Sequence, residues 1–154
     1  MDDSCVIWIT GLSAAGKTTI ATALSEKLIA LGQRVEHLDG DLIRKIFPGT
    51  GYSREERDRH VKRIGYLSAM LEKHDVFVVA SFISPYREAR AFVRSQCSNF
   101  IEVYVSTPLE ECEKRDPKGL YKKARTGEIS NFTGISDPYE VPENAEIVIK
   151  TEEL

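Results

Sequence analysis

A glycine-rich stretch near the start of the chain, GLSAAGKTT at residues 11–19, has the composition and spacing of a phosphate-binding loop. It matches the pattern G-x-x-x-x-G-K-[ST] through Gly11, Gly16, Lys17 and Thr18. Glycine lets main-chain N–H groups approach phosphate oxygens, the lysine neutralises β- and γ-phosphates, and the threonine hydroxyl can bind Mg²⁺. Because an apolar run precedes the loop and a helical pattern follows it, we interpret it as a site for a purine triphosphate with Mg²⁺.

The rest of the sequence narrows the class of phosphate-loop protein. It contains no guanine-reading Asn-Lys-x-Asp motif, and the apolar runs VFVVAS and FIEVYVS end in serine, where a motor or transport ATPase would normally have a carboxylate. Carboxylates instead follow VEHL, at Asp39 and Asp41. Asp41 is a candidate for orienting Mg²⁺ or accepting the proton of an attacking hydroxyl. The alternative is that Asp39-Gly40-Asp41 is only a turn followed by a helix N-cap.

Basic side chains gather at the same predicted edge of the protein. Arg44 follows Asp41 by one helical turn, and Arg57 and His60 share one face of the next predicted helix. Phosphoryl transfer depends on such cations to stabilise charge. For the lysines, solvated surface charge is an equally good interpretation. The other cations in this group are Arg87, Arg90, Arg115, Lys118, Lys122, Lys123 and Arg125.

The elements that must position these residues follow from the hydrophobic pattern. Apolar runs of strand length alternate with helical patterns, which predicts an α/β fold with a parallel sheet and helices on both faces. The expected strands are 5–10, 34–39, 76–81, 100–106 and 146–150. We expect a helix after the loop that stops at Gly32, a long helix capped by Ser53 and Glu56, a helix with Pro85 at its first position, and a short helix over 108–115. Residues 116–144 lack periodicity and are expected to form a lid on a single domain spanning 1–154.

Bulk composition sets further limits. The chain has 154 residues, a net charge of −3 and three cysteines without metal or disulfide spacing. We therefore expect no nucleic-acid or membrane partner and no zinc site, and we expect Cys5 and Cys112 to be buried thiols. With no secretory leader and no apolar stretch of membrane length, we expect a protein of the reducing cytoplasm.

Taken together, the motifs resemble those of the adenylylsulfate kinase family. The resemblance is carried by GLSAAGKTT, LDGDLIR, GYSREERDRHVKRIG, ISPYREAR, EVYVSTPLEECEKRDPKGLYKKARTGEI and NFTGISDPYEVP, and it spans nearly the whole chain. It implies a parallel five-stranded P-loop kinase sheet with a mobile lid. It also implies transfer of the γ-phosphate of ATP to the 3′-hydroxyl of adenosine 5′-phosphosulfate (APS), which gives 3′-phosphoadenylylsulfate (PAPS) and ADP in sulfate assimilation. Members are often dimers, which implies a homodimer.

The resemblance also implies roles for individual residues. Lys17, Asp41 and Ser84 would be catalytic, with Ser84 matching the family's phosphorylated serine, and Thr18 and Asp41 would hold the metal. ATP would be bound by Gly11, Leu12, Ser13, Ala14, Ala15, Gly16, Lys17, Thr18, Thr19 and Arg115. The acceptor would be bound by Asp39, Arg44, Tyr52, Arg57, His60, Ile83, Ser84 and Phe132, with Tyr52 and Phe132 enclosing its adenine.

The sequence departs from the family pattern on the acceptor side only. Tyr52 stands where phenylalanine is expected, His60 where asparagine is frequent, and KIFPGT at 45–50 differs from the usual stretch. Two alternatives therefore stay open: a related kinase that acts on a different nucleotide anhydride, and a nucleotide-binding protein without turnover.

Overall fold

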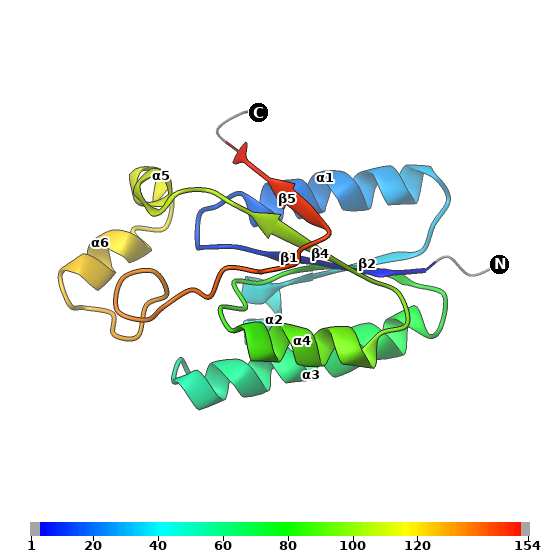
Figure 1. The fold of residues 1–154 in the computed structure, drawn as a ribbon, viewed down its shortest axis with the longest axis horizontal. Helices are drawn as coiled ribbons and strands as arrows, with labels where there is room; N and C mark the ends of the chain where they lie inside the picture. The colour runs from blue at the N-terminus through cyan, green and yellow to red at the C-terminus, as the bar shows by residue number, and fades with distance from the viewer. Residues whose placement is uncertain (1–3, 152–154) are drawn as a thin grey trace.

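The computed structural model describes residues 4–151 and contains one five-stranded sheet (Figure 1). Its strands lie in the order β2-β3-β1-β4-β5 and pair in parallel throughout. They are β1 (Val6–Thr10), β2 (Val35–Asp39), β3 (Phe77–Ser81), β4 (Phe100–Val105) and β5 (Ile147–Ile149). The α/β fold class and all five strands expected from the sequence are thus confirmed, each strand to within two residues at either end.

Helices cover both faces of the sheet, as the pattern predicted. Helix α1 (Lys17–Ala30) lies above the sheet in Figure 1, and α3 (Arg54–Glu72) and α4 (Arg87–Gln96) lie below it. The short helices are α2 (Gly40–Ile46), α5 (Leu109–Arg115) and α6 (Leu120–Arg125), and α5 and α6 project from the edge where the strands end. None of the helices within residues 4–151 is long and apolar enough to cross a bilayer.

The core consists of two apolar layers, one on each face of the sheet. Strand β1 is buried along its whole length, and its side chains alternate between the two layers: Val6 and Trp8 pack toward α3 and α4, whereas Ile7 and Ile9 pack toward α1. This alternation is the period of two that a pleated strand imposes. Because β1 is packed on both faces, the position of its carboxyl end is fixed, and so is the start of the loop that follows it.

Several local signals behave as expected. The Glu56 main-chain N–H donates to Ser53 Oγ at 3.1 Å, which caps α3, and Gly32 has a left-handed φ of +84° just after α1. Cys5 and Cys112 are both buried. Burial raises the pKa of both thiols, so neither has the thiolate character of a reactive cysteine.

Two expectations about local structure are wrong. Pro85 does not open α4, because Tyr86 is the extended N-cap residue and the helix begins at Arg87. The Pro85 carbonyl instead accepts a hydrogen bond from the Glu140 N–H at 2.8 Å, so tertiary pairing holds this residue outside the helix.

The second error concerns 116–144, which was expected to lack regular structure but contains α6. The Asp116 carboxylate accepts from the N–H groups of Tyr121 and Lys122 at 3.0 and 3.2 Å, and the Tyr121 ring is buried against the core. A six-residue helix is too short to show a clear period in the sequence.

Candidate active site

The phosphate loop lies between the end of β1 and the start of α1. Gly16 has a φ of +109°, and a Cβ on Gly11 would lie 2.9 Å from the Val105 carbonyl oxygen, so both positions require glycine. Lys17 Nζ donates to the Leu12 carbonyl at 2.7 Å, which folds the side chain back over the loop. Burial of this ammonium lowers the pKa of Lys17 to about 8. The first N–H groups of an α-helix have no partners within the helix, so the start of α1 can face an anion.

Carboxylates at the end of β2 face this loop. Asp39 Oδ1 accepts from Thr18 Oγ1 at 3.2 Å and from Ser81 Oγ at 3.1 Å, and its other oxygen caps α2 through the Asp41 N–H at 3.3 Å. Asp39 is thus the N-cap of α2, but Gly40 and Asp41 belong to the helix and do not form a separate turn. Asp41 lies in the first turn of α2, its side chain is 67% exposed, and it forms an ion pair with Lys118 of the 116–144 segment.

Hydroxyl and carboxylate oxygens are the donors that Mg²⁺ prefers when phosphates and waters complete its coordination. Thr18 of α1, Asp39 at the end of β2 and Asp41 of α2 supply such oxygens, so the donor set fits Mg²⁺ bound together with a triphosphate. Within residues 4–151, no three His, Cys, Asp or Glu side chains group into a metal site of their own.

Two arginines lie beyond Asp41. The Arg44 guanidinium donates to the Thr50 and Gly51 carbonyls at 3.1 and 3.3 Å and stands 4.2 Å from the ring centre of Tyr52. Burial lowers the pKa of Arg44. The nearby charge of Arg57 lowers it further, whereas the charge of Asp41 acts in the opposite direction.

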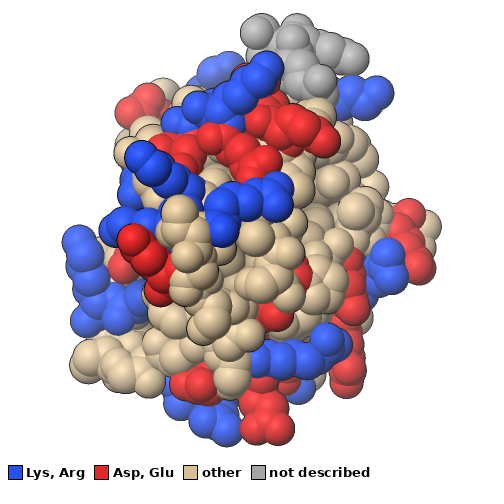
Figure 2. Space-filling model, turned by 90° about the vertical axis from the view of Figure 1, so that its left-hand side faces the viewer, with Lys and Arg blue, Asp and Glu red and all other residues tan. Residues whose placement is uncertain are grey.

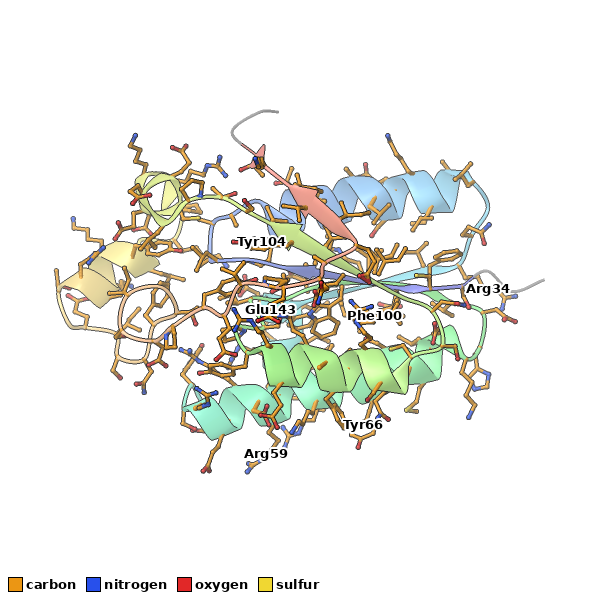
Figure 3. The ribbon with its side chains drawn as sticks, viewed as in Figure 1. Arg34, Arg59, Tyr66, Phe100, Tyr104 and Glu143 are labelled. Atoms are coloured by element: carbon orange, nitrogen blue, oxygen red, sulfur yellow. The ribbon has the colours of Figure 1, made fainter. Side chains whose placement is uncertain are left out.

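Arg57 of α3 is buried. Its side chain donates to Thr133 Oγ1 at 2.9 Å and to Asp137 Oδ2 at 3.2 Å. Arg59, two residues further along α3, points away from the sheet (Figure 3). The long helix therefore directs Arg57 inward, where it ties α3 to the loop at 132–137.

His60 is buried on α3 one turn after Arg57, and neither of its ring nitrogens has a hydrogen-bond partner among residues 4–151. Its ring meets Phe82 edge-on at 6.0 Å. Burial lowers the pKa of His60 to about 4, with smaller contributions from the charges of Arg44 and Arg63, so the imidazole is neutral near pH 7. An unsatisfied buried polar group is costly and calls for an explanation.

The turn after β3 places Ile83 and Ser84 at the same edge. Ser84 is buried and left-handed, with a φ of +41°. Its hydroxyl accepts from Trp8 Nε1 at 3.0 Å and donates to Thr10 Oγ1 at 3.0 Å, and Thr10 in turn donates to the Ile83 carbonyl at 2.7 Å. In this structure the Ser84 hydroxyl thus belongs to an interior network.

The segment 116–144 returns to the phosphate loop. Arg115 donates to the Ala14 and Ala15 carbonyls at 3.5 and 3.4 Å, and Tyr121 OH donates to the Ser13 carbonyl at 2.8 Å. Phe132 packs edge-on against Tyr121, with ring centres 5.0 Å apart. The aromatics predicted to enclose a base thus have different partners here, Tyr52 with Arg44 and Phe132 with Tyr121.

Comparison with known proteins gives the family. The sequence model described as Adenylylsulphate kinase matches residues 3–150, nearly the full chain. The chain belongs to the adenylylsulphate kinase family.

Individual members of this family are close relatives. An adenylyl-sulfate kinase of Microcystis aeruginosa is 54% identical over 147 residues, covering 95% of this chain and 81% of its own length. One of Synechococcus sp. (strain JA-3-3Ab) is 56% identical over 148 residues, covering 96% of this chain and 84% of its own. The solved structure of Mycobacterium tuberculosis APS kinase CysC in complex with AMPPNP and APS is 37% identical, with a TM-score of 0.93 over 97% of this chain and 90% of that chain.

The site of this family member opens on the edge where the strands end. Figure 2 looks onto that side of the molecule and shows lysine and arginine side chains in several groups around the face, interleaved with acidic ones. Several of the cations named from the sequence pair with Asp or Glu, among them Arg57, Arg115, Lys118 and Arg125. Arg90 does not reach this edge, because its side chain is buried in the interior.

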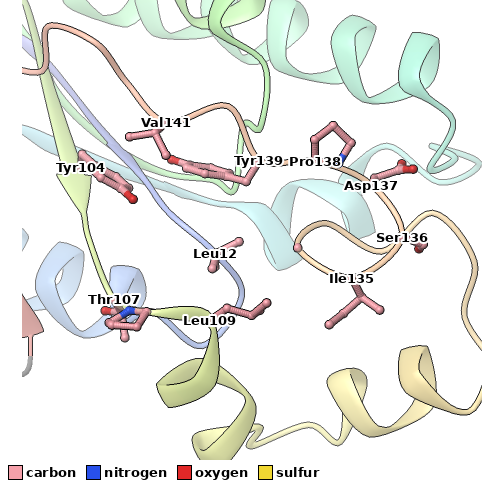
Figure 4. A pocket seen from close by; sticks show the side chains of 12 residues that line it. Leu12, Tyr104, Thr107, Leu109, Ile135, Ser136, Asp137, Pro138, Tyr139 and Val141 are labelled. Carbon is pink, nitrogen blue, oxygen red and sulfur yellow. The ribbon is translucent and has the colours of Figure 1, made fainter.

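A cavity of about 530 Å³ lies beside the phosphate loop (Figure 4). It is bounded by Leu12 of the loop, by the turn from β4 into α5 and by the segment 134–141. Tyr104 and Tyr139 stack across it with ring centres 6.0 Å apart.

Sequence reasoning missed several residues that bind the predicted site residues directly. Thr133 and Asp137 bind Arg57, and Tyr121 contacts Ser13 and Phe132. Tyr139 also bonds to Thr10, which directly precedes the phosphate loop. A signal was present for all of them, because Thr133, Asp137 and Tyr139 lie in the motif NFTGISDPYEVP and Tyr121 lies in EVYVSTPLEECEKRDPKGLYKKARTGEI. The motifs did not show which residue each would contact, since the hydrogen-bond partners are 76 to 129 positions away in sequence.

Proposed function

We propose that this protein phosphorylates the 3′-hydroxyl of APS with ATP, giving PAPS and ADP. The observation that carries the proposal is the position of Asp41. It lies in the first turn of α2, next to Asp39, whose carboxylate accepts from Thr18 of the phosphate loop, and one helical turn before Arg44. Membership of the adenylylsulphate kinase family, with relatives above 50% identity over nearly the whole chain, supports this substrate pair.

ATP would be held by its phosphates. The amides of residues 11–19 and the start of α1 would surround the β- and γ-phosphates, and Lys17 would leave the Leu12 carbonyl to neutralise them. Arg115 lies against the outer side of the loop, where it can reach the nucleotide base or ribose. Because a lysine whose pKa is lowered to about 8 is not fully charged above that pH, a triphosphate would restore its charge on binding.

Thr18 and Asp41 would hold Mg²⁺, with Asp39 orienting the threonine hydroxyl. When bound, the ion would neutralise charge on the β- and γ-phosphate oxygens. Asp41 has a second role open to it, because its exposed carboxylate can orient the acceptor hydroxyl or take its proton. For either role, the ion pair between Asp41 and Lys118 has to open or shift when substrates bind.

The acceptor would bind on the other side of Asp41. Arg44 and Arg57 would pair with the phosphosulfate, since guanidinium groups bind such oxyanions through two parallel hydrogen bonds. The unpartnered imidazole of His60 and the main chain at Ile83 would contact the rest of the nucleotide. Tyr52 and Phe132 would stack on the adenine, each leaving its present partner to do so.

The segment 116–144 would act as a lid on a single kinase domain. It contacts the phosphate loop through Tyr121, and Lys118 pairs with Asp41 of α2. Closure over both nucleotides would exclude water, which competes as a phosphoryl acceptor. Ser84 would help to shape the pocket without being phosphorylated, because its hydroxyl is committed to Trp8 and Thr10 and direct in-line transfer needs no phosphoenzyme.

A coupled assay of ADP release, run with APS and with other nucleotide acceptors, tests the function. We expect ATP turnover to require APS, and kcat/KM for APS to exceed that for other nucleotide anhydrides. A preference for a different anhydride would favour the related kinase. ATP binding by calorimetry with no product from any acceptor would favour a protein without turnover. Light scattering of the same sample would test whether the protein is the homodimer that we propose.

A further inference from the structure

Arg90 of α4 is among the most deeply buried side chains of the protein, although it is charged; only 2% of it is exposed. Its guanidinium makes contacts on every side. One Nη donates to the Ser84 carbonyl, the other donates to the Glu140 carbonyl, and Nε lies 3.5 Å from the Glu102 carboxylate. The ring centre of Tyr139 is 5.6 Å away.

These contacts join two segments that are far apart in sequence. The turn at 82–84 follows β3, whereas 138–141 is the stretch that leads out of the lid toward β5. Each contributes a main-chain carbonyl to the same guanidinium. A backbone carbonyl points in a fixed direction, and the guanidinium is planar and rigid. A guanidinium that donates to one carbonyl of each segment therefore fixes the distance between the two segments.

The two segments carry acceptor-side residues. Ser84 has a left-handed φ of +41°, which an L-residue adopts only when its surroundings hold it there. Its carbonyl, which is turned toward Arg90, and its hydroxyl, which accepts from Trp8, together fix the turn that places Ile83.

On the other segment, Tyr139 and Asp137 reach back to the site. Tyr139 OH lies 2.7 Å from Thr10 Oγ1, directly before the phosphate loop. Asp137, two residues earlier, binds Arg57 at 3.2 Å. Figure 4 shows Asp137, Pro138 and Tyr139 following one another along this strip of chain. A shift of residues 139–140 would therefore be passed to Arg57.

We propose that Arg90 is a positioning residue for the acceptor half of the site, which it holds by fixing the turn at 82–84 to the segment 138–141. Arg90 would act through Ser84 and residues 138–141, because its own side chain is buried beneath them. The expected effect on KM for APS rests on the proposed function. That Arg90 fixes the turn at 82–84 does not depend on it.

The competing explanation is that Arg90 serves only as the partner of Glu102. A buried ion pair is seldom a net source of stability, because removing two charges from water costs about as much as their attraction returns. The pair uses only the Nε side of the guanidinium, whereas both Nη groups serve the carbonyls of 84 and 140. The two roles are separable by mutation.

The variants follow from this geometry. Arg90→Lys keeps the charge beside Glu102 but loses the planar fork. Arg90→Met combined with Glu102→Gln removes the fork without leaving a buried carboxylate unpaired, and Glu102→Gln alone keeps the fork. Arg94→Met is the matched control, because Arg94 lies one turn along α4 and pairs with Glu146 at 2.6 Å, away from both segments.

The first readout is kinetic. We expect Arg90→Lys and the double variant to raise KM for APS about tenfold or more, while KM for ATP stays within about twofold, since misplacement by a fraction of an ångström is enough for such a loss. Glu102→Gln and Arg94→Met should leave both constants within about twofold. The proposal would be overturned if folded Arg90→Lys had an unchanged KM for APS. It would also be overturned if KM for APS and KM for ATP rose equally across the variants, in proportion to the fall in melting temperature.

The second readout does not depend on activity. Trp8 is the single tryptophan of the chain, and its Nε1 donates to Ser84 Oγ. Its fluorescence should shift in Arg90→Lys and in the double variant, and should stay as in the wild type in Arg94→Met. A wild-type protein that does not phosphorylate APS would refute the proposed function, and the fluorescence would still decide whether Arg90 fixes the turn. Identical Trp8 spectra in all folded variants would refute the positioning role.

Discussion

Replacing His60 by leucine should remove a pH-dependent loss of stability. His60 is buried, both its nitrogens lack partners, and its pKa of about 4 in the folded protein is below the ordinary value of 6.5. Between those two values the unfolded chain binds a proton that the folded protein does not, so stability falls as the pH falls through this window. The charges of Arg44 and Arg63 act in the same direction.

The magnitude follows from the size of the shift. Lowering the pH from 7 to 5 should cost the wild type about 2 kcal/mol through His60, out of about 3 kcal/mol for the whole window. His60→Leu has a side chain of similar volume that cannot titrate, so it should lose that much less stability over the same interval. At pH 7 it should also be about 1 kcal/mol more stable, because the unpaired nitrogens are gone.

Urea unfolding at pH 7, 6 and 5 measures this directly. Carboxylates contribute the same slope to every variant, so the difference between variants isolates the histidine. His74 is exposed, and His74→Leu is the matched control that should keep the wild-type slope. Equal losses between pH 7 and 5 in wild type and His60→Leu would show that the buried imidazole either is protonated in the fold or has a bound partner.

Three further predictions concern the site and the core. Asp41→Ala should bind ATP normally but lose turnover by about a hundredfold to ten-thousandfold, and near-normal turnover would remove Asp41 from the mechanism. Lys17→Met should weaken ATP binding measured by calorimetry, because the loop would lose its only side-chain cation toward the phosphates; unchanged binding would contradict the role of the loop. Gly65→Ala should lower the free energy of unfolding by about 1 kcal/mol, since its Cβ would lie 2.8 Å from Val93 Cγ2, and Val93→Ala should relieve this in the double variant. If the two changes simply add, the clash is not the cause.

Most of the fold could be predicted from the sequence, because its signals are local. Five apolar runs of strand length alternate with helical patterns, and each became a strand of the sheet. The phosphate loop could also be identified in advance, since its glycines, lysine and threonine are contiguous and their roles depend on main-chain geometry within nine residues. The cap at Ser53 and the stop at Gly32 are local in the same sense.

The surroundings of the acceptor side were decided by the tertiary structure. Nothing local shows that Arg57 meets Thr133 and Asp137, or that His60 is left without a partner, because these depend on how α3 packs against segments dozens of residues away. The helix at 120–125 likewise depends on the Asp116 cap and on the burial of Tyr121.

Sequence by itself thus determined which elements form and which loop can hold a triphosphate, because backbone preference and hydrophobic period act over a few neighbouring residues. Only the tertiary structure decided which charged side chains meet. Arg90 illustrates the difference: its sequence position suggested a phosphate-binding cation, whereas packing places it in the interior, between two carbonyls and Glu102. Pairing between distant charges is set by the arrangement of the layers, and no short stretch of sequence records it.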